Sequence, residues 1–250
     1  MTKSAPQKIL VLGALSAIAQ AVARLHAERG DHLVLVARQE ARLAQNAEDL
    51  RARGAKVDVA ATDLSITQNA QAQFDGWLAE LGGIDVVYLF YGYLGEQARA
   101  EADLAEAMRI ITTNYTSAAA WSLLAAARLA RQKAGALVVI SSVAGDRGRQ
   151  SNFIYGSAKG GLSLLVQGIA HRLADTGARA VVVKLGFVDT PMTDHMDKKG
   201  FLWAKPKGIA PRIVQAAHKG PPIQYVPWFW RFIMLIIRFM PAVLFHKTKL

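Results

Sequence analysis

Residues 8–19 read KILVLGALSAIA, a short apolar run followed by one glycine and several small residues. The run 8–12 predicts a buried strand, and the small residues after it predict a tight turn into a helix. The same alternation of short apolar runs and longer helical patterns continues along two thirds of the chain, which is typical of βαβ units. The sequence therefore predicts an α/β fold with a doubly wound parallel sheet.

The remaining strands and helices follow from the same patterns. Near-continuous apolar character in the strands indicates that helices cover both faces of the sheet. No repeat or linker interrupts residues 1–226, which are expected to form one Rossmann-like NAD(P)-binding catalytic domain, with residues 227–250 as a basic, amphipathic C-terminal segment. Further strands are expected at 32–37, 56–60, 85–90, 136–141 and 180–185, and helices at 18–29, 40–53, 67–81, 104–133 (with a break near Asn114) and 155–176.

Length and composition support a single well-filled domain: 250 residues are 52% hydrophobic and 20% charged. The chain has no cysteine, which excludes a disulfide framework, a thiolate metal site and a cysteine nucleophile. No metal site is expected. The start, MTKSAPQKILVLG, holds no apolar run long enough for a signal peptide, so a cytoplasmic protein is expected.

The net charge of +11 is distributed unevenly. Residues 1–197 carry 20 basic and all 19 acidic side chains, whereas residues 198–250 carry 10 basic side chains and no acidic one. A neutral body with a basic tail favours local contact with an anionic surface over a nucleic-acid-binding face. Nucleic acid is therefore not expected as a partner.

The turn that follows the first strand suits a dinucleotide. Small residues let the backbone approach a pyrophosphate, and the start of the next helix supplies N–H donors and the positive end of its dipole. Only Gly13 is a glycine here, because Ala17 and Ala19 stand where further glycines would be expected. A tight packing turn without a ligand is the alternative interpretation.

The end of the second strand indicates which dinucleotide would bind. A carboxylate at this point would hold the ribose 2′-hydroxyl of NAD, but the chain has Arg38, with Arg42 one helical turn later. Two cations suit the 2′-phosphate of NADP, so NADPH is the expected cofactor, with NADH possible. The alternative is that both arginines are merely solvated. Asp63, after the third strand, is a candidate contact for the adenine amino group.

The stretch from Ser142 to Lys159 carries the expected chemistry. Tyr155 and Lys159 are four residues apart and share one helix face. A neighbouring ammonium favours the phenolate, so Lys159 is expected to lower the pKa of Tyr155 toward neutrality. Ser142 would bind the same substrate oxygen, and Asn114 would hold a proton-relay water. The alternative is a tyrosine packed on its own lysine, with serines that cap a turn.

These motifs, in this order, resemble the short-chain dehydrogenase/reductase family over residues 8–226. The resemblance implies that Tyr155 donates the proton, Lys159 lowers its pKa and holds the nicotinamide ribose, Ser142 orients the carbonyl and Asn114 sustains the relay. The chain departs from the family pattern at Ala17, Ala19, Tyr91 and Leu185. The implied cofactor-binding residues are Gly13, Leu15, Ser16, Ala17, Ile18, Arg38, Arg42, Asp63, Leu64, Tyr91, Gly92, Tyr155, Lys159, Gly186, Val188 and Thr190.

Residues 13–19 and the tail segment 225–231 (YVPWFWR) are similar to a subgroup of that family that contains decaprenylphosphoryl-2-keto-ribose reductase. This resemblance implies an NADPH-dependent ketoreductase for a lipid-linked or membrane-resident ketone, with a 2-keto-pentosyl phospholipid favoured. One alternative is a soluble ketoreductase, or a reductase of a 3-keto sphingoid or acyl lipid, whose tail serves oligomerisation. An alternative of another class is a catalytically silent NADP-binding sensor or scaffold.

The tail segment 228–240 predicts a helix of about 20 Å, too short to cross a ~30 Å hydrocarbon core. Arg231 and Arg238 are seven residues apart on one face, and the rest of the circumference is apolar. This pattern suits a helix that lies in an anionic membrane interface, with Lys247 and Lys249 also at the headgroups. The protein is thus expected peripherally on the inner face of the membrane. Packing into a dimer or tetramer is the alternative, and a homo-oligomer is expected. Residues 191–207 are interpreted either as a lid or as a surface loop, in which His195 is a solvated side chain.

Overall fold

The computed structural model describes residues 5–194, 197–198 and 200–248. His195 and Lys249, named above, lie outside the described residues. Seven parallel strands form the main sheet in the order β3-β2-β1-β4-β5-β6-β9, which is the doubly wound arrangement expected from the sequence. The strands are β1 (Lys8–Leu12), β2 (His32–Ala37), β3 (Lys56–Ala61), β4 (Val86–Leu89), β5 (Ala136–Ser142), β6 (Arg179–Leu185) and β9 (Ile223–Val226).

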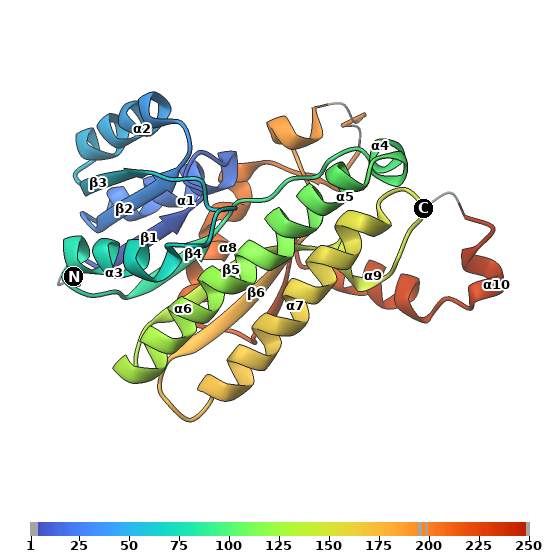
Figure 1. Cartoon of the computed structure of the whole chain (residues 1–250). Helices are drawn as coiled ribbons and strands as arrows, with labels where there is room; N and C mark the ends of the chain where they lie inside the picture. The colour runs from blue at the N-terminus through green and yellow to red at the C-terminus, as the bar shows by residue number, and fades with distance from the viewer. Residues whose placement is uncertain (1–4, 195–196, 199, 249–250) are drawn as a thin grey trace.

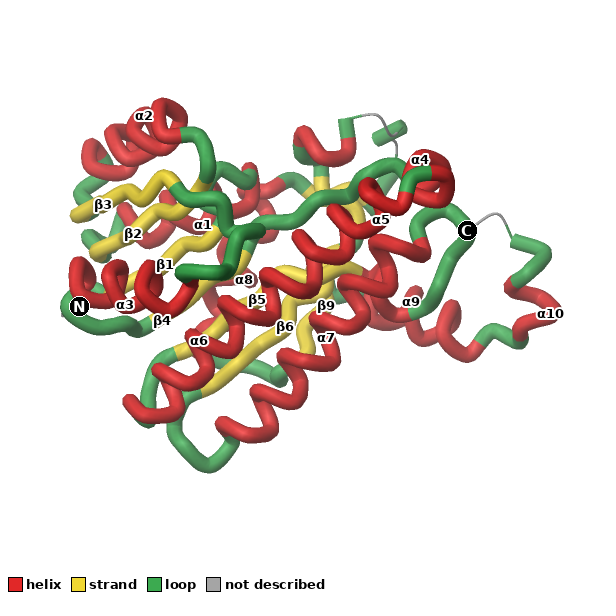
Figure 2. Tube along the Cα trace, viewed as in Figure 1, coloured by secondary structure: helices red, strands yellow, loops and turns green. Residues whose placement is uncertain are grey.

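Helices cover both faces of the sheet. Figure 2 shows α6 and α7 in front of the strands and α1 and α8 behind them. Alternate residues of β1 pack into the two layers, because Ile9 and Val11 face one side while Leu10 and Leu12 face the other. The helices are α1 (Ala17–Ala27), α2 (Glu40–Ala52), α3 (Ala70–Leu81), α4 (Gln97–Ala102), α5 (Leu104–Ile111), α6 (Ser117–Gln132), α7 (Phe153–Leu173), α8 (Pro206–His218), α9 (Trp230–Phe239) and α10 (Ala242–Phe245).

The six expected strands are confirmed within one residue at each end, but several elements were not predicted, among them α8, β9 and α4. Helix α8 contains Pro206 and Pro211 and an early Gly208, all of which weaken a helical pattern. Strand β9 has four residues, lies at the sheet edge and pairs only with β6. Helix α4 has six residues and few apolar ones. Short or proline-containing elements have little hydrophobic periodicity, so whether they form a helix or a strand depends on tertiary packing.

The expected break in the segment 104–133 is a turn of π-helix. Residues Thr112–Thr116 join α5 to α6, and Asn114 at the centre of this turn is fully buried. A π turn inserts an extra residue into an α-helix and frequently marks a functional site. The π turn therefore keeps the helical run unbroken and buries the Asn114 side chain next to Gly92, which follows β4.

The C-terminal segment folds back onto the body through α9. Trp230, Met234 and Ile237, spaced as one helix face, are buried in a cluster with Val143 and Phe245. This face of α9 therefore packs on the protein and is not available to a membrane. The sequence had suggested that all apolar sides of this helix, away from the two arginines, could contact a membrane. Figure 1 shows α9 and α10, in red, at the side of the molecule away from α2. In the part of the chain that the structure describes, no helix is long and apolar enough to cross a bilayer.

Candidate active site

The parallel sheet brings the expected site residues to one edge. Because all seven strands run in the same direction, the segments that follow them meet at the carboxyl end of the sheet, where open α/β folds bind ligands. The residues there are Gly13 after β1, Arg38 after β2, Asp63 after β3, Tyr91 and Gly92 after β4, Ser142 at the end of β5 and Gly186 after β6.

The turn after β1 is built for close backbone approach. Gly13 has φ +86°, and a Cβ on it would lie 2.6 Å from the Tyr91 backbone nitrogen, so only glycine fits. Ser16 caps α1 without a side-chain hydrogen bond, and the first turn of α1 contains no acidic residue. The N–H groups of Ala17 and Ile18 consequently have no side-chain cap from Ser16, and this helix start fits a pyrophosphate. Leu15 lies within the same turn.

Arg38 and Asp63 lie close together beside this turn. Asp63 accepts two hydrogen bonds from Ser65, through the backbone N–H at 2.9 Å and the hydroxyl at 2.7 Å. Burial acts to raise the pKa of Asp63, but the Ser65 hydrogen bonds and the charge of Arg38 outweigh it and lower that pKa. Arg38 and Arg42 are exposed, and Arg42 donates to the Gln39 side chain at 2.9 Å. A phosphate would therefore find both guanidinium groups accessible.

Tyr91 stands where the family pattern has a small residue. Its hydroxyl lies 3.0 Å from Ser117 Oγ on α6, and burial raises the pKa of Tyr91. The ring is packed against the core cluster that contains α6 and α3. This larger side chain is thus accommodated by the helix layer, and Leu64 belongs to the same buried cluster.

Ser142, Tyr155 and Lys159 come together between β5 and α7. Ser142 is near enough to the Tyr155 hydroxyl to lower the pKa of that group, and Ser142 Oγ accepts from the Ala144 backbone N–H at 3.1 Å. Lys159 Nζ lies 5.9 Å from the Tyr155 ring centroid and donates to the Ile140 carbonyl at 3.3 Å. Close backbone packing holds this arrangement, because a Cβ on Gly145 would lie 2.6 Å from the Gly160 nitrogen.

The electrostatics differ from the sequence expectation. Burial raises the pKa of Tyr155 to about 12, although the hydrogen bond with Ser142 acts in the opposite direction. Burial also lowers the pKa of Lys159 to about 8. The prediction that Lys159 lowers the pKa of Tyr155 toward neutrality is therefore wrong for the protein by itself, because desolvation of the phenolate raises that pKa and Lys159 is not among the groups that lower it.

Asn114 lies beside Lys159 and anchors the loop that follows β4. Its Oδ1 accepts from the Tyr93 backbone N–H at 3.1 Å, and its Nδ2 donates to the Tyr93 carbonyl at 2.6 Å. A Cβ on Gly92 would lie 2.8 Å from Asn114 Oδ1 and 3.3 Å from Lys159 Nζ. Gly92 thus marks the point where Asn114 and Lys159 converge, and the Asn114 side chain fixes the Tyr93 backbone.

The segment after β6 completes the site. Strand β7 (Phe187–Val188) pairs with β8 (Trp203–Ala204) in a small second sheet, and Val188 is buried. The Thr190 N–H donates to Thr193 Oγ1 at 3.2 Å. Gly186 lies directly against the Trp230 indole, because a Cβ there would be 1.8 Å from Nε1. Helix α9 therefore covers the segment expected to bind the nicotinamide.

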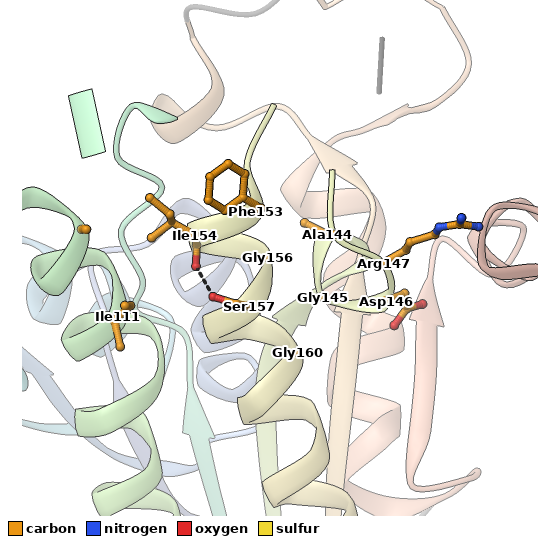
Figure 3. A pocket seen from close by; sticks show the side chains of 12 residues that line it. Ile111, Ala144, Gly145, Asp146, Arg147, Phe153, Ile154, Gly156, Ser157 and Gly160 are labelled. Carbon is orange, nitrogen blue, oxygen red and sulfur yellow. Dashed lines mark hydrogen bonds between the residues drawn. The ribbon is translucent and has the colours of Figure 1, made fainter. Parts of the chain in front are cut away.

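A cavity of about 470 Å³ adjoins the Ser142–Tyr155 stretch (Figure 3). Ala144 and Gly156, close neighbours of the two site residues along the chain, line it together with Ile111, Phe153 and Ile154. Arg147 extends from its rim toward α9 (Figure 3), where it donates to the carbonyls of Ile237 and Met240, the latter at 2.6 Å. The loop between Ser142 and Tyr155 is thus tied to the C-terminal helix.

Three residues near the site were not predicted: Tyr93, Arg149 and Trp230. The Tyr93 hydroxyl donates to the buried Glu106 at 2.5 Å, and Arg149 contacts Met234 of α9. The position of Arg149 between Ser142 and Tyr155 in the sequence was an available signal that it lies near these two residues. Nothing in the sequence indicated that Trp230 would meet Gly186.

Comparisons with known proteins define the class. Residues 7–200 match the family model of short chain dehydrogenases, and the chain belongs to this family. It is therefore an oxidoreductase that acts on CH–OH or C=O groups with NAD(P), and the turn after β1 and the convergence at Gly92 fit that cofactor.

Individual relatives span three quarters or more of the chain. An uncharacterized oxidoreductase from the mprA 5′ region of Streptomyces coelicolor is 39% identical over 97% of this chain and 96% of its own length. A putative ketoacyl reductase of granaticin polyketide synthesis from Streptomyces violaceoruber is 33% identical over 75% of this chain and 70% of its own. The crystal structure of a putative gluconate dehydrogenase from Agrobacterium tumefaciens has the same fold, with a TM-score of 0.80 at 23% identity, over 89% of this chain and 95% of that one.

Proposed function

We propose that the protein is an NADPH-dependent ketoreductase for a ketone that resides in a membrane, with a 2-keto-pentosyl phospholipid as the favoured substrate. One observation carries this proposal: helix α9 covers Gly186 with one face and presents a second, apolar face to solvent. A helix in this position would place the site at the surface of a bilayer, where a lipid-linked ketone is found.

The residues at the strand ends support the chemistry. When bound, the nicotinamide would supply the hydride that reduces the carbonyl carbon. Ser142 holds the carbonyl oxygen, and Tyr155 donates its Oη proton to that oxygen as charge develops there. The raised pKa keeps Tyr155 protonated at neutral pH, as a proton donor requires. Lys159 holds the cofactor ribose, and Asn114 keeps the neighbouring Tyr93 loop in place. Arg38 and Arg42 hold the 2′-phosphate of NADPH.

The C-terminal segment has an exposed apolar surface, which we call the outer apolar face. Its side chains are 52–76% exposed, although apolar residues of this size usually lose most of their contact with water on folding. Arg231 and Arg238 are exposed on α9 and Lys247 is exposed just after α10, and no acidic residue lies beyond position 197. We define the outer apolar face as Trp228, Phe232, Leu235, Ile236, Phe239, Val243 and Leu244.

An anionic membrane fits this face better than a second copy of the chain. Apolar side chains enter the headgroup region while the arginines meet lipid phosphates. In a two-fold symmetric dimer through the same face, like cations would lie near one another without acidic partners from this segment. These features support the proposal that this helix holds the protein peripherally on the membrane.

Similarity to a ketoacyl reductase supports a second substrate. The relative from Streptomyces violaceoruber is a putative ketoacyl reductase, so a long-chain 3-keto acyl lipid is the alternative membrane-resident ketone. Both substrates use the same proton donor and differ in what is attached to the carbonyl.

The test is flotation with neutral phosphatidylcholine vesicles and with vesicles that contain phosphatidylglycerol. The variant Ile236→Gln/Phe239→Gln removes apolar surface from the outer face, and Leu104→Gln/Leu164→Gln makes the same change at exposed positions on α5 and α7. We expect the full chain and the α5/α7 variant to bind anionic vesicles and the α9 variant to lose binding. If all three proteins fail to bind, or if only the α9 variant becomes monomeric in light scattering, the membrane proposal is wrong.

A further inference from the structure

Arg149 is a buried cation without a carboxylate partner. It lies between Ser142 and Tyr155 and is only 8% exposed. Its Nε is buried and has no hydrogen-bond partner, and its Nη2 contacts only the weak acceptor Met234 Sδ, at 3.2 Å. Among the described residues, no salt bridge involves its guanidinium. Burial of a charge is costly and lowers the pKa of Arg149, and the charge of Asp146 offsets only part of that effect without forming an ion pair with it.

The nearby carboxylate is already occupied. Asp146, three residues earlier, forms an ion pair with Lys184 through Oδ1 and accepts from the Tyr225 hydroxyl through Oδ2 at 2.7 Å. Arg147 directs its guanidinium to main-chain carbonyls of α9. The loop thus brings two arginines toward α9 and has one acidic group, both oxygens of which have other partners.

A second unpartnered donor, the indole N–H of Trp230, lies on the face of α9 that carries Met234. Trp230 precedes Met234 by one helical turn, so the two side chains are neighbours on the inner face of α9. The Trp230 Nε1 is buried without a hydrogen-bond partner and is packed on Gly186. The unpaired donors of Arg149 and Trp230 therefore both lie on the inner side of α9, one beside Met234 and the other at Gly186, which follows β6 at the carboxyl edge of the sheet.

We infer that Arg149 binds an anionic group of the ketone substrate, a phosphate or a carboxylate, with the Trp230 N–H as an additional donor. The inference rests on the proposed ketoreductase function and narrows its substrate class. A guanidinium presents its N–H groups in a planar fork that matches these anions and retains its charge when buried. A 2-keto-pentosyl phospholipid carries such a phosphate. A keto-sphingoid base carries a cationic amine instead, which Arg149 would repel.

Two pairs of ketones, each an anion and its neutral ester, test this inference by turnover. The purified full chain with NADPH is given 4-oxopentanoate and its methyl ester, and 2-oxopropylphosphonate and its dimethyl ester. Arg149→Met removes the charge but keeps an apolar side chain of similar length. Arg179→Met is the matched control, because Arg179 also has a buried, unpartnered Nε but begins β6 at the opposite edge of the sheet.

We expect Arg149→Met to lower kcat/KM for the anionic ketones by about 10- to 100-fold, the range expected for a lost hydrogen bond to a charged group. For the neutral esters we expect less than about a threefold change, and Arg149→Lys should recover part of the loss. The two anions show whether phosphate or carboxylate is preferred. Equal losses for charged and neutral ketones, or no loss for either anion, would overturn the inference.

A binding measurement separates this inference from the proposed function. Each protein is saturated with NADPH, which fills the cofactor's phosphate sites, and is titrated with inorganic phosphate while its melting temperature is recorded. We expect phosphate to stabilise the full chain and Arg179→Met but not Arg149→Met. An identical response in all three proteins overturns the anion site. If no ketone is reduced but phosphate binding depends on Arg149, the ketoreductase proposal fails and the anion site stands.

Discussion

The Trp230 indole lies directly on the Cα of Gly186. A Cβ at Gly186 would be 1.8 Å from Nε1, 2.1 Å from Cε2 and 2.3 Å from Cδ1 of Trp230. Gly186 follows β6 at the carboxyl edge of the sheet, and Trp230 is the first residue of α9. This contact joins the C-terminal helix to the segment expected to hold the nicotinamide, so a change in one is expected to affect the other.

The first prediction concerns this contact. Gly186→Ala should destabilise the protein by about 1–3 kcal/mol, because an added methyl group in a closely packed site forces neighbours to move. For a chain of this size, 1 kcal/mol corresponds to roughly 2–4 °C in melting temperature. The control is Gly168→Ala on α7, where a Cβ would meet nothing within 4 Å.

A double variant identifies Trp230 as the residue that clashes. Trp230→Leu should itself destabilise, and Gly186→Ala should cost less in that background than in the native chain. Additive effects of the two changes would contradict the contact.

The second prediction concerns the choice of cofactor. Arg38 is exposed at the end of β2 and close enough to Asp63 to lower its pKa. Arg38→Asp should weaken NADPH binding by about 1.5–3 kcal/mol, since a charged hydrogen bond to the 2′-phosphate is lost, and should change NADH affinity little. Fluorescence titration with both cofactors measures this, and Arg131→Asp, an exposed position at the end of α6, controls for net charge. A native chain that prefers NADH would contradict the assignment of Arg38 to the phosphate.

The third prediction concerns the proton donor. Tyr155→Phe removes the hydroxyl beside Ser142 and leaves the ring in place. Turnover should fall by roughly 10²- to 10⁴-fold, the usual contribution of a positioned acid, while NADPH affinity stays nearly unchanged. Lys159→Ala should instead reduce both turnover and cofactor affinity. Near-normal turnover by Tyr155→Phe would end the ketoreductase proposal.

The fourth prediction concerns stability at alkaline pH without cofactor. Burial lowers the pKa of Lys159 from 10.5 to about 8, so between these values the unfolded chain binds more protons than the folded one. Stability should therefore rise with pH in this window, by about 2 kcal/mol between pH 8 and 10. The raised pKa of Tyr155, about 12, lowers stability only above pH 10, where unfolded tyrosines ionise.

Urea denaturation of the native chain and of Lys159→Met at pH 8, 9 and 10 isolates this effect, because other groups titrate equally in both proteins. As the pH rises from 8 to 10, the unfolding free energy of the native chain should increase relative to that of Lys159→Met. A difference that is independent of pH would show that Lys159 has an ordinary pKa.

Much of the fold was predictable from local sequence. The apolar runs at 8–12, 32–37 and 136–141 are strands because residues buried on both faces leave an unbroken apolar pattern. Parallel strands then place whatever follows them at one edge, so Gly13, Asp63 and Ser142 could be assigned to one site before their distances were known. Tyr155 and Lys159 share a face through helical spacing alone.

Only the tertiary structure decided how these groups are surrounded. The sequence placed a cation near Tyr155, but the degree of burial sets the sign of the pKa change, and burial depends on elements from across the chain. Similarly, Arg149 is one of many arginines in the sequence. The structure distinguishes Arg149 from the other arginines because the nearby Asp146 is paired with Lys184 of β6 and Tyr225 of β9 and forms no ion pair with Arg149.

The C-terminal segment shows the same division. Its sequence determined an amphipathic helix that is too short to cross a bilayer and is free of acidic residues. Which apolar face packs on the body was decided by Trp230 meeting Gly186 and by Arg147 reaching the α9 carbonyls. Helical periodicity groups residues into faces, but only contacts between segments that are distant in the chain determine which face is buried and which remains exposed.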